Sequence, residues 1–521
     1  MPKLTIDKKN VQVDNGATIL DAACKLGIEI PTMCFLKGYK ASTSCMLCVV
    51  KVNNSNKLLP ACGTIAQEGM KVETDSDEIR QARKAALELL LSDHAGDCIG
   101  PCQAACPAHM NIPLMIRQIA DGKLHDAIVT VKKDIPLPAV LGRICPKPCE
   151  QTCRRAQFDK AVSICLLKRY VADVDLQSEK PYVPKRDKNR NKKVAVVGAG
   201  PAGLAAAYYL LKDGYSCAVY DDHESPGGML RYGVPQDKLP TNVLDAEIAL
   251  IKKLGMVFKG QMPIGYALKM EELRKDFDAV LIAIGQTKPG YVESMGLEAS
   301  PKGIAINPRT YETNLSGVFA AGAAVRKSKL AVRAIADGKE AAVAIGQFLS
   351  GQSMTGSPHV FNTHMGKLKD DEVERFVADA DKTERLTPSP EGAGFTDEQA
   401  RTEAARCLHC DCRKPQNCKL RQYAQEYGAK PGRYKGGRRS FSQHTQHADI
   451  IYEPGKCISC GLCIQIAAEA GEPLGLTFIG RGFDVRVAVP FDRTITEGLK
   501  LAAKKCVEAC PTGAIVFKTK N

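Results

Sequence analysis

Val194-Ala-Val-Val-Gly198-Ala-Gly200-Pro-Ala-Gly203 is an apolar run that leads directly into a glycine-rich turn. The pattern predicts a buried strand, a tight turn and a helix, as in a dinucleotide-binding unit. Gly198 permits the turn, Gly200 lets the backbone approach a pyrophosphate, and Gly203 lets the helix pack closely on the strand. A second expected strand ends at Asp221, whose carboxylate is placed to accept a ribose hydroxyl. The residues expected at the nucleotide are Gly198, Gly200, Pro201, Ala202, Gly203 and Asp221.

Two later segments indicate which dinucleotide binds, because the first fingerprint alone is compatible with NAD or FAD. Phe277–Gly285 is an apolar strand ending in glycine, and Gly317–Gly322 precedes a helical stretch. Both resemble the closing motifs of flavin reductases that carry two dinucleotide-binding domains. The loop Gly227–Pro235 resembles the flavin-facing loop of the glutamate synthase small subunit. The resemblance implies an FAD-binding domain over residues 193–350, with Gly228, Arg231, Gly285 and Gly322 also at the cofactor.

The flavin segment departs from that family in two ways. The family inserts a second dinucleotide domain between its two FAD segments, whereas here Ile284 is followed almost directly by Gly303 and no second fingerprint exists. A compact nucleotide domain needs roughly 100 residues, so the nicotinamide-binding domain is expected to be missing. In addition, Ala323 stands where the family usually has an aspartate beside the ribityl chain. A flavin-free Rossmann-like scaffold is therefore the alternative to an FAD domain.

Cysteines flank this segment and are absent from residues 218–406. The chain has 22 of them, with 13 in the first 220 residues and nine in the last 120. No apolar run is long enough to cross a membrane, and the N-terminus lacks a signal-peptide apolar region. We therefore expect a cytoplasmic protein whose reduced thiols bind metal, because disulfides are rare in that compartment.

The first cysteine group lies in a small expected sheet domain, residues 1–75. Its spacing, C-x10-C-x2-C-x13-C, suits a [2Fe-2S] cluster held by a loop and one distant thiolate, with zinc as the alternative. The four residues are Cys34, Cys45, Cys48 and Cys62. The segment Leu20–Cys34 resembles the ferredoxin domain of the complex I large iron–sulfur subunit and of iron-only hydrogenases. By that resemblance Cys24 is not a ligand.

The second group lies in an expected helical domain, residues 76–178. Its members are Cys98, Cys102, Cys106, Cys145, Cys149, Cys153 and Cys165. Cys106 and Cys145 are each followed by proline, which is common in [4Fe-4S] segments. The group resembles the two-cluster domain of the glutamate synthase small subunit and of dihydropyrimidine dehydrogenase.

That resemblance implies two interleaved clusters, each of which lacks one ligand. Cys98, Cys102 and Cys153 would share one cluster, and Cys106, Cys145 and Cys149 would share the other. His94 stands near the missing position of the first cluster, in the His-x3-Cys pattern of complex I, and is otherwise a capping or surface histidine. Cys165 stands near the missing position of the second cluster and is otherwise a buried packing thiol.

Residues 395–521 carry two further cysteine groups and are expected to form a ferredoxin-like domain. The first group, C-x2-C-x-C-x5-C, indicates a [4Fe-4S] cluster or a structural zinc ion. It consists of Cys407, Cys410, Cys412 and Cys418.

The second group supplies one complete [4Fe-4S] site, because its first motif lacks a fourth cysteine. Its ligands are Cys457, Cys460, Cys463 and Cys510. Cys506 is left over as the remnant of a second site. The intervening segment Phe478–Arg486 resembles complex I and formate dehydrogenase iron–sulfur proteins.

The formal net charge of +14 does not predict nucleic-acid binding, because thiolate-held clusters and a pyrophosphate offset much of it. The basic segment Lys430–Arg439 is interpreted as a solvated loop or a protein-docking patch. We expect a multidomain protein of α/β and α+β class: a β-grasp-like ferredoxin domain, a helical iron–sulfur domain, a Rossmann-like FAD domain and a C-terminal ferredoxin-like domain.

The expected function is electron transfer by FAD, one [2Fe-2S] cluster and three to four [4Fe-4S] clusters, within a larger redox complex. The expected partners are NADH dehydrogenase, hydrogenase or formate dehydrogenase subunits, or ferredoxin, with no nucleic acid and no membrane span. The alternatives are a self-contained NAD(P)H-dependent flavin reductase of the glutamate synthase small-subunit type, and a non-enzymatic scaffold that holds zinc and structural clusters. No acid–base or nucleophilic constellation stands out in the sequence.

Overall fold

The computed structural model describes residues 1–265, 267–287, 290–358, 360–378, 380–388, 392–434 and 436–518. The chain divides into two compact units whose segments alternate along the sequence. Unit 1 consists of Met1–Ile99, Val360–Ala378 and Cys410–Asn521, and unit 2 of Gly100–His359 and Asp379–His409. This division differs from the four consecutive domains expected, because the expected domains 76–178 and 395–521 each contribute to both units.

Unit 1 begins with a five-stranded mixed sheet in the order β2-β1-β5-β3-β4. Its strands are β1 (Lys3–Ile6), β2 (Lys9–Gln12), β3 (Val49–Val52), β4 (Leu58–Pro60) and β5 (Lys71–Glu73). The alternation of Leu4 and Ile6 with polar residues buries one face of β1, as a half-buried strand requires. Helix α1 (Ile19–Lys25) begins at Thr18 with a capping box and packs on this core. The ferredoxin-like sheet expected for residues 1–75 is present.

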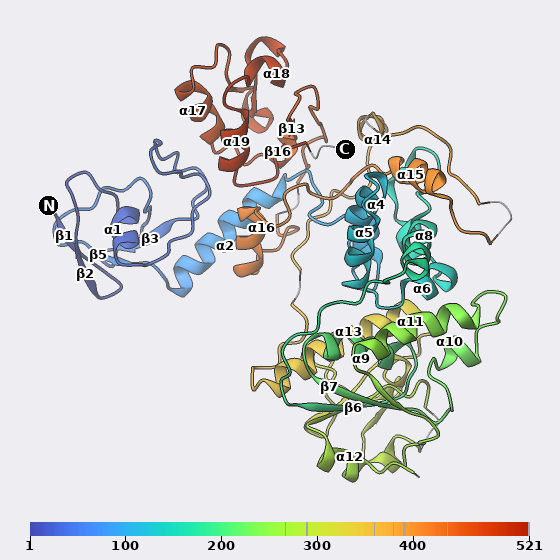
Figure 1. Cartoon of the computed structure of the whole chain (residues 1–521). Coiled ribbons are helices and arrows are strands. Elements are labelled where there is room, and N and C mark those ends of the chain that lie inside the picture. The colour runs from blue at the N-terminus through green and yellow to red at the C-terminus, as the bar shows by residue number, and fades with distance from the viewer. Residues whose placement is uncertain are drawn as a thin grey trace. The chain divides into compact units, whose positions relative to one another are not determined.

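The remainder of unit 1 combines helices, two pairs of short strands and long irregular segments (Figure 1). Its helices are α2 (Asp77–Ser92), α14 (Asp370–Val377), α16 (Lys419–Glu426), α17 (Leu462–Glu469), α18 (Ile495–Gly498) and α19 (Ala503–Ala509). Its strands form two antiparallel pairs, β13 (Ile450–Tyr452) with β16 (Ile515–Phe517), and β14 (Thr477–Ile479) with β15 (Arg486–Ala488). Arg438 and Arg439 of the basic segment form ion pairs with Glu372 and Asp93, so they are engaged inside the unit. Lys435 of that segment lies outside the described residues.

Unit 2 combines a helical part with a parallel sheet. The helices of the first part are α3 (Pro101–Ala105), α4 (Ile112–Ala120), α5 (Leu124–Lys132), α6 (Pro138–Ile144), α7 (Pro148–Gln151), α8 (Ile164–Gln177) and α15 (Asp397–Ala405). Proline occupies the first turn of α3, α4, α6 and α7, where its missing N–H costs no helical hydrogen bond. Short helices that begin at proline allow the chain to turn repeatedly between cysteines.

The sheet of unit 2 is five-stranded and entirely parallel, in the order β12-β9-β6-β7-β8. Its strands are β6 (Lys193–Val197), β7 (Ser216–Tyr220), β8 (Val257–Lys259), β9 (Ala279–Ile282) and β12 (Val318–Ala320). Helices α9 (Pro201–Lys212), α11 (Thr241–Lys253) and α13 (Ala331–Leu349) lie on one face and α12 (Met270–Asp276) lies on the other (Figure 1). A short helix, α10 (Met229–Tyr232), follows β7.

Between β9 and β12 the chain forms only small elements. In the described residues of this interval the strands are β10 (Ala299–Ser300) and β11 (Gly303–Ile304), which pair with each other, and no second parallel sheet occurs. No helix in the described part of the chain is both long and apolar enough to span a membrane.

Candidate functional site

The first candidate metal centre is formed by four buried thiols beside the N-terminal sheet. Cys34, Cys45, Cys48 and Cys62 are all at most 3% exposed. The Cys48 and Cys62 Sγ atoms are 3.3 Å apart, and the hydrogen bond between them lowers the pKa of the Cys48 thiol to about 7. Cys34 also contacts Cys45 and Cys62. The structure thus brings together all four residues expected at the [2Fe-2S] cluster, whereas Cys24 is exposed on α1.

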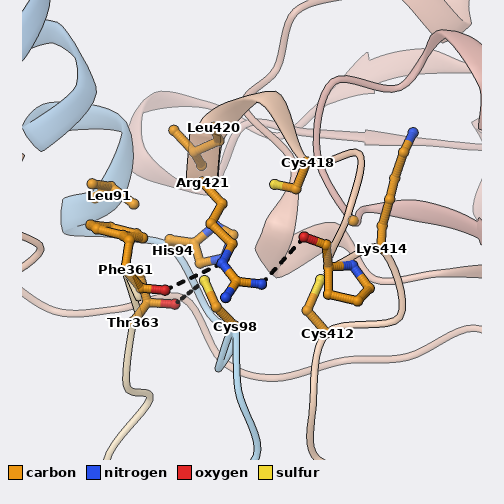
Figure 2. Close-up of a pocket in the computed structure, with 12 residues that line it drawn as sticks. Leu91, His94, Cys98, Phe361, Thr363, Cys412, Lys414, Cys418, Leu420 and Arg421 are labelled. Atoms are coloured by element: carbon orange, nitrogen blue, oxygen red, sulfur yellow. Dashed lines mark hydrogen bonds between the residues drawn. The ribbon is translucent and has the colours of Figure 1, made fainter. Parts of the chain in front are cut away.

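The second candidate centre, called here the His94 pocket, draws on three distant segments of unit 1. His94 and Cys98 follow α2, Cys412 lies before α16, and Cys418 is the N-cap residue of α16. Figure 2 shows the three sulfur atoms and the imidazole around one pocket, whose lining also includes Phe361, Thr363 and two cations, Lys414 and Arg421. The resemblance implied that Cys98 shares a cluster with Cys102 and Cys153, and the spacing grouped Cys412 with Cys407. The structure instead places Cys98 and Cys412 around the same pocket.

Close backbone packing gives the His94 pocket its shape. A Cβ atom at Gly513 would lie 2.5 Å from the Cys412 Sγ atom, so only glycine leaves that sulfur its position. The Thr363 hydroxyl donates to the Gly96 carbonyl at 2.6 Å, and its oxygen lies 3.3 Å from the Cys98 Sγ atom. Burial, together with the nearby Lys456 ammonium, lowers the pKa of His94 to about 4. The imidazole is therefore neutral at pH 7, which is the form that binds metal.

The third candidate centre lies between α17 and α19 in the C-terminal part of unit 1. Its thiols are Cys457, Cys460, Cys463 and Cys510, as expected from their spacing. Each of the other three lies close enough to Cys463 to raise the pKa of that thiol, although burial is the largest cause. Ser459 donates its backbone N–H to the Cys457 Sγ atom at 3.3 Å, as is common around thiolate-bound clusters. The leftover Cys506 is fully buried in the core beneath.

The fourth candidate centre, called here the Lys168 pocket, lies among the short helices of unit 2. Four thiols line it: Cys106, Cys145, Cys149 and Cys165. The first three were expected to share a cluster, with Cys165 as the candidate for its missing position, and the structure places Cys165, in the first turn of α8, in the same lining. Lys168, one turn farther along α8, also lines the pocket, as does Val332 of α13. Sequence reasoning missed Lys168, because a lysine near a helical cysteine ordinarily faces solvent.

Three further cysteines of unit 2 lie on segments that a polar network holds together. The Thr152 hydroxyl donates to the Pro101 carbonyl at 3.2 Å, which joins the chain next to Cys153 with the chain next to Cys102. Arg155 donates to the Arg406 carbonyl at 3.0 Å, which joins the same turn with the chain next to Cys407.

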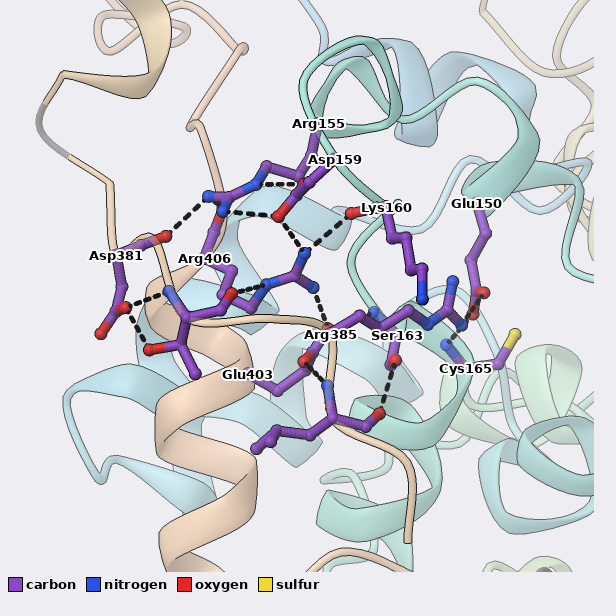
Figure 3. A network of polar contacts seen from close by, with 12 residues as sticks. Glu150, Arg155, Asp159, Lys160, Ser163, Cys165, Asp381, Arg385, Glu403 and Arg406 are labelled. Atoms are coloured by element: carbon purple, nitrogen blue, oxygen red, sulfur yellow. Dashed lines mark hydrogen bonds and ion pairs between the residues drawn. The ribbon is translucent and has the colours of Figure 1, made fainter.

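The network around these contacts is buried and carries paired charges (Figure 3). Arg155 and Arg406 are fully buried and share the Asp159 carboxylate, with N–O distances of 2.7 and 2.9 Å. Arg406 also pairs with Glu403 at 2.7 Å, and the Glu403 carboxylate accepts the Ser163 N–H. Breaking such a buried pair leaves an uncompensated charge, so the network fixes residues 380–388 and 397–407 on the helical part of unit 2.

The hydrophobic core of unit 1 connects three of the candidate centres. One contiguous cluster of buried residues contains Cys34 and Cys45 of the first centre, Cys98 and Cys418 of the His94 pocket, and Cys460 of the third centre. In unit 2 a single core likewise contains thiols of the Lys168 pocket together with residues of β6, β7 and α9. Each unit therefore has a hydrophobic core that includes thiols of its candidate centres.

The candidate nucleotide site lies where β6 enters α9. The N-cap residue of α9 is Gly200, which has no side chain to cap the helix, and a Cβ atom there would meet nothing within 4 Å. A Cβ atom at Gly203 would lie 1.9 Å from the Gly198 carbonyl oxygen, so the helix packs as closely as expected. The open, uncapped helix N-terminus fits the pyrophosphate of a dinucleotide.

The remaining residues expected at the nucleotide lie around this turn. The Asp221 carboxylate accepts the Ala199 and His223 N–H groups at 2.6 and 3.0 Å, and a role toward a ribose stays a prediction. Arg231 forms an ion pair with Asp245. A Cβ atom at Gly228 would lie 2.7 Å from the Gly200 Cα atom, and one at Gly322 would lie 2.7 Å from the Ala202 Cβ atom. Gly228 and Gly322 therefore border the turn. Gly285 lies just after the end of β9, the strand next to β6 in the sheet.

Comparison with protein families identifies three segments of the chain. Residues 2–77 match the 2Fe-2S iron–sulfur cluster binding domain. Residues 93–180 match dihydropyrimidine dehydrogenase domain II, with a 4Fe-4S cluster, and residues 196–254 match the NAD(P)-binding Rossmann-like domain. Two iron–sulfur domain types and one Rossmann-like domain are combined in this chain. The mixed α/β class and these three domain types are thus confirmed.

Characterised relatives are similar to part of the chain. The NADPH-Fe(3+) oxidoreductase subunit beta of Geobacter sulfurreducens is 41% identical over 209 residues, which cover 39% of this chain and 30% of the relative. The NADP(+)-dependent formate dehydrogenase subunit beta of Moorella thermoacetica is 37% identical over 206 residues, which cover 36% and 29%. The glutamate synthase [NADPH] small chain of Bacillus subtilis is 36% identical over 187 residues, which cover 36% and 38%. The chain spans well under half the length of each, and all three relatives are oxidoreductase subunits or chains.

Proposed function

We propose that the chain is an electron-transfer subunit that relays electrons between a partner dehydrogenase or hydrogenase and a ferredoxin or NAD(P)-linked partner. The observation that carries the proposal is the continuous core of unit 1, in which thiols of three candidate centres pack together. Metal clusters that share one hydrophobic core lie close together, as electron transfer between them requires. The protein supplies their position and their electrostatic surroundings.

The proposed ligand sets follow the pockets. Cys34, Cys45, Cys48 and Cys62 hold a [2Fe-2S] cluster, and the thiols Cys457, Cys460, Cys463 and Cys510 hold a [4Fe-4S] cluster. The His94 pocket holds a second [4Fe-4S] cluster, with His94 as the one nitrogen ligand among three thiolates. The Lys168 pocket holds a third. A structural zinc ion is the alternative at the His94 pocket, because zinc also binds Cys3His sets.

We propose a fourth [4Fe-4S] cluster in unit 2, on Cys102, Cys153 and Cys407. These residues lie on segments that the contacts of Thr152 and Arg155 join. Cys410 follows Cys407 at the C-x2-C spacing that is typical of iron–sulfur segments, and its role as a ligand stays a prediction from the sequence. The cysteines with no proposed metal are Cys24, Cys217 and Cys506.

We propose FAD as the dinucleotide of unit 2. FAD exchanges electrons singly or in pairs, which suits it to feed one-electron clusters. In this role the backbone N–H groups at the start of α9 bind the pyrophosphate, and Gly200 leaves room for it. Val332, on helix α13 of the same parallel-sheet part, lines the Lys168 pocket, so that pocket is placed beside the nucleotide-binding part.

Replacing Gly200 by alanine tests the nucleotide assignment. The backbone at Gly200 is extended and a Cβ atom there meets no protein atom, so Gly200→Ala is expected to fold normally but to lose most bound flavin. Flavin fluorescence after denaturation gives the content, and circular dichroism checks the fold. Gly432→Ala, where a Cβ atom also meets nothing, is the matched control. Full flavin retention in Gly200→Ala would contradict the assignment.

A second candidate function is a self-contained NAD(P)H-dependent flavin reductase, which the names of the relatives from Geobacter and Bacillus favour. Rapid mixing of the purified chain with NADH or NADPH distinguishes the two. We expect little bleaching of the flavin without a partner subunit, because the interval between β9 and β12 carries only small elements in its described residues. Fast bleaching by either nucleotide would support the reductase instead. We place this chemistry in the cytoplasm, where thiols stay reduced.

A further inference from the structure

Lys168 is a buried cation surrounded by thiols. It lies on α8 one turn after Cys165, so both side chains share a face of the helix. Its side chain is 4% exposed, and its Nζ atom lies 4.0 Å from the Cys165 Sγ atom. Cys106, Cys145 and Cys149 complete the lining around it.

No carboxylate neutralises Lys168 in the described part of the chain. Its ammonium group forms no ion pair there, and its hydrogen bond is to the Cys165 sulfur. Two acidic residues contact this end of α8: Glu150 accepts the Cys165 N–H at 3.0 Å, and Glu403 accepts the Ser163 N–H at 2.8 Å. Glu150 is paired with Arg385 and Glu403 with Arg406, each at 2.7 Å, so both charges are already compensated.

Lys456, a lysine close to the His94 pocket, is arranged differently. Lys456 is also buried, at 4% exposed, and approaches the pocket close to Cys412. Its Nζ atom lies 2.6 Å from a carboxylate oxygen of Glu453, which is equally buried. The pair contributes no net charge, and the two cations that line the His94 pocket, Lys414 and Arg421, are only half-buried. Lys168 instead contributes a buried positive charge to its own pocket.

A buried ammonium group without a counter-ion is strongly disfavoured, so a partner of opposite charge is required. The four thiols are the available partner, because metal binding converts them to thiolates.

We propose that Lys168 is a fixed positive charge that raises the reduction potential of the iron–sulfur cluster in its pocket. The inference rests on the proposed function, because it requires a cluster on those four thiolates. Reduction adds one negative charge to a cluster, and a cation in van der Waals reach stabilises the reduced form more than the oxidised form. The cluster of the Lys168 pocket is therefore biased to accept electrons from the nucleotide-binding part of unit 2.

The test is a redox titration of the Lys168→Met variant. The full chain is purified anaerobically, and electron paramagnetic resonance monitors the reduction of each cluster. Methionine keeps the apolar stem and removes the charge. At a fixed potential the reduced-to-oxidised ratio of one cluster is expected to fall at least tenfold, a negative shift of 59 mV or more for one electron. The other clusters should titrate as in the unchanged protein.

Lys168→Arg is the matched charge-retaining variant and should keep the potential of that cluster. A double variant, Glu453→Gln with Lys456→Met, removes a neutral pair and should shift no cluster by as much. An unchanged potential in Lys168→Met would overturn the proposal. If Lys168→Met fails to hold the cluster, Lys168→Arg decides: assembly at the original potential supports a role of the charge, and failure to assemble overturns it.

Failure of the proposed function gives a different result. In that case Cys149→Ser would leave the iron and acid-labile sulfide content of the chain unchanged, because its pocket would hold no cluster. Loss of iron in Cys149→Ser together with an unshifted potential in Lys168→Met would overturn the role of Lys168 alone.

Discussion

The His94 pocket and the Lys168 pocket place similar ligands on different kinds of chain. All four thiols of the Lys168 pocket lie within residues 106–165: Cys106 and Cys145 at the C-terminal ends of α3 and α6, Cys149 in α7 and Cys165 in α8. The His94 pocket instead combines residues 94–98 with Cys412, Cys418 and Gly513, from the other end of the chain. A compact motif is visible as a spacing in the sequence, whereas a site built from distant segments becomes visible only when the fold is known.

The two pockets differ in charge as well. Among the described residues Lys168 has thiols as its close polar partners, whereas Lys456 is paired with Glu453. Loss of the metal therefore has unequal consequences. The Lys168 pocket would retain an unpaired buried cation, whereas at the His94 pocket Lys456 would keep Glu453 and the lining cations Lys414 and Arg421 are only half-buried.

The largest expected effect follows from this difference in buried charge between the two pockets. Cys149→Ser and Cys418→Ser should each lose about four iron atoms per chain, the content of one [4Fe-4S] cluster. Cys149→Ser should in addition destabilise unit 2 by about 3–5 kcal/mol, because the partner of a buried charge is removed. Iron analysis and thermal melting measure the two effects. Cys506→Ser is the control and should keep the iron content and the melting temperature of the unchanged protein. A larger melting shift in Cys418→Ser would reverse the comparison.

A smaller effect is expected from Gly513→Ala, which acts on the His94 pocket alone. The added Cβ atom would lie 2.5 Å from the Cys412 Sγ atom and must displace that ligand. We expect partial loss of iron from the chain, with the signal of the cluster in the Lys168 pocket retained. Gly432→Ala adds the same methyl group in open space and should change neither. Full iron content in Gly513→Ala would show that Cys412 is not a ligand.

The smallest effect is expected from Glu453→Gln, which leaves a buried lysine without a carboxylate partner beside the His94 pocket, as in the Lys168 pocket. The substitution removes a negative charge and leaves the Lys456 ammonium uncompensated. The potential of a cluster beside Lys456 should rise, because its reduced form is then stabilised, by up to about 59 mV for a tenfold change in ratio. A redox titration measures the shift, and a fall in potential would contradict the electrostatic argument.

The sequence predicted the local features and missed the long-range ones for a physical reason. The glycine fingerprint at Gly198 and the four ferredoxin thiols follow from spacings within one segment of the chain, and the set Cys106, Cys145 and Cys149 was implied by the resemblance to the two-cluster domain. The grouping of Cys98 depends on how α16 packs after residue 410, which no spacing records. The role of Lys168 depends on burial, which a single helix pattern cannot specify for one lysine.

The alternation of segments between the two units explains why the expected domain 395–521 is divided between them. Residues 395–521 read as one domain because their cysteines are close in sequence, yet α15 packs in unit 2 and Cys412 lies in unit 1. The Arg155–Asp159–Arg406 network accounts for this, since it holds the chain immediately before Cys407 on the helical part of unit 2. The C-x2-C-x-C-x5-C motif therefore contributes Cys412 and Cys418 to the His94 pocket without acting as one self-contained site.

Iron content of the double variant Cys98→Ser/Cys412→Ser tests the central claim most directly. If both residues bind the same cluster in the His94 pocket, each single variant and the double variant should lose the same amount, about four iron atoms per chain. A double variant that loses about eight, the sum of two independent clusters, would contradict the account.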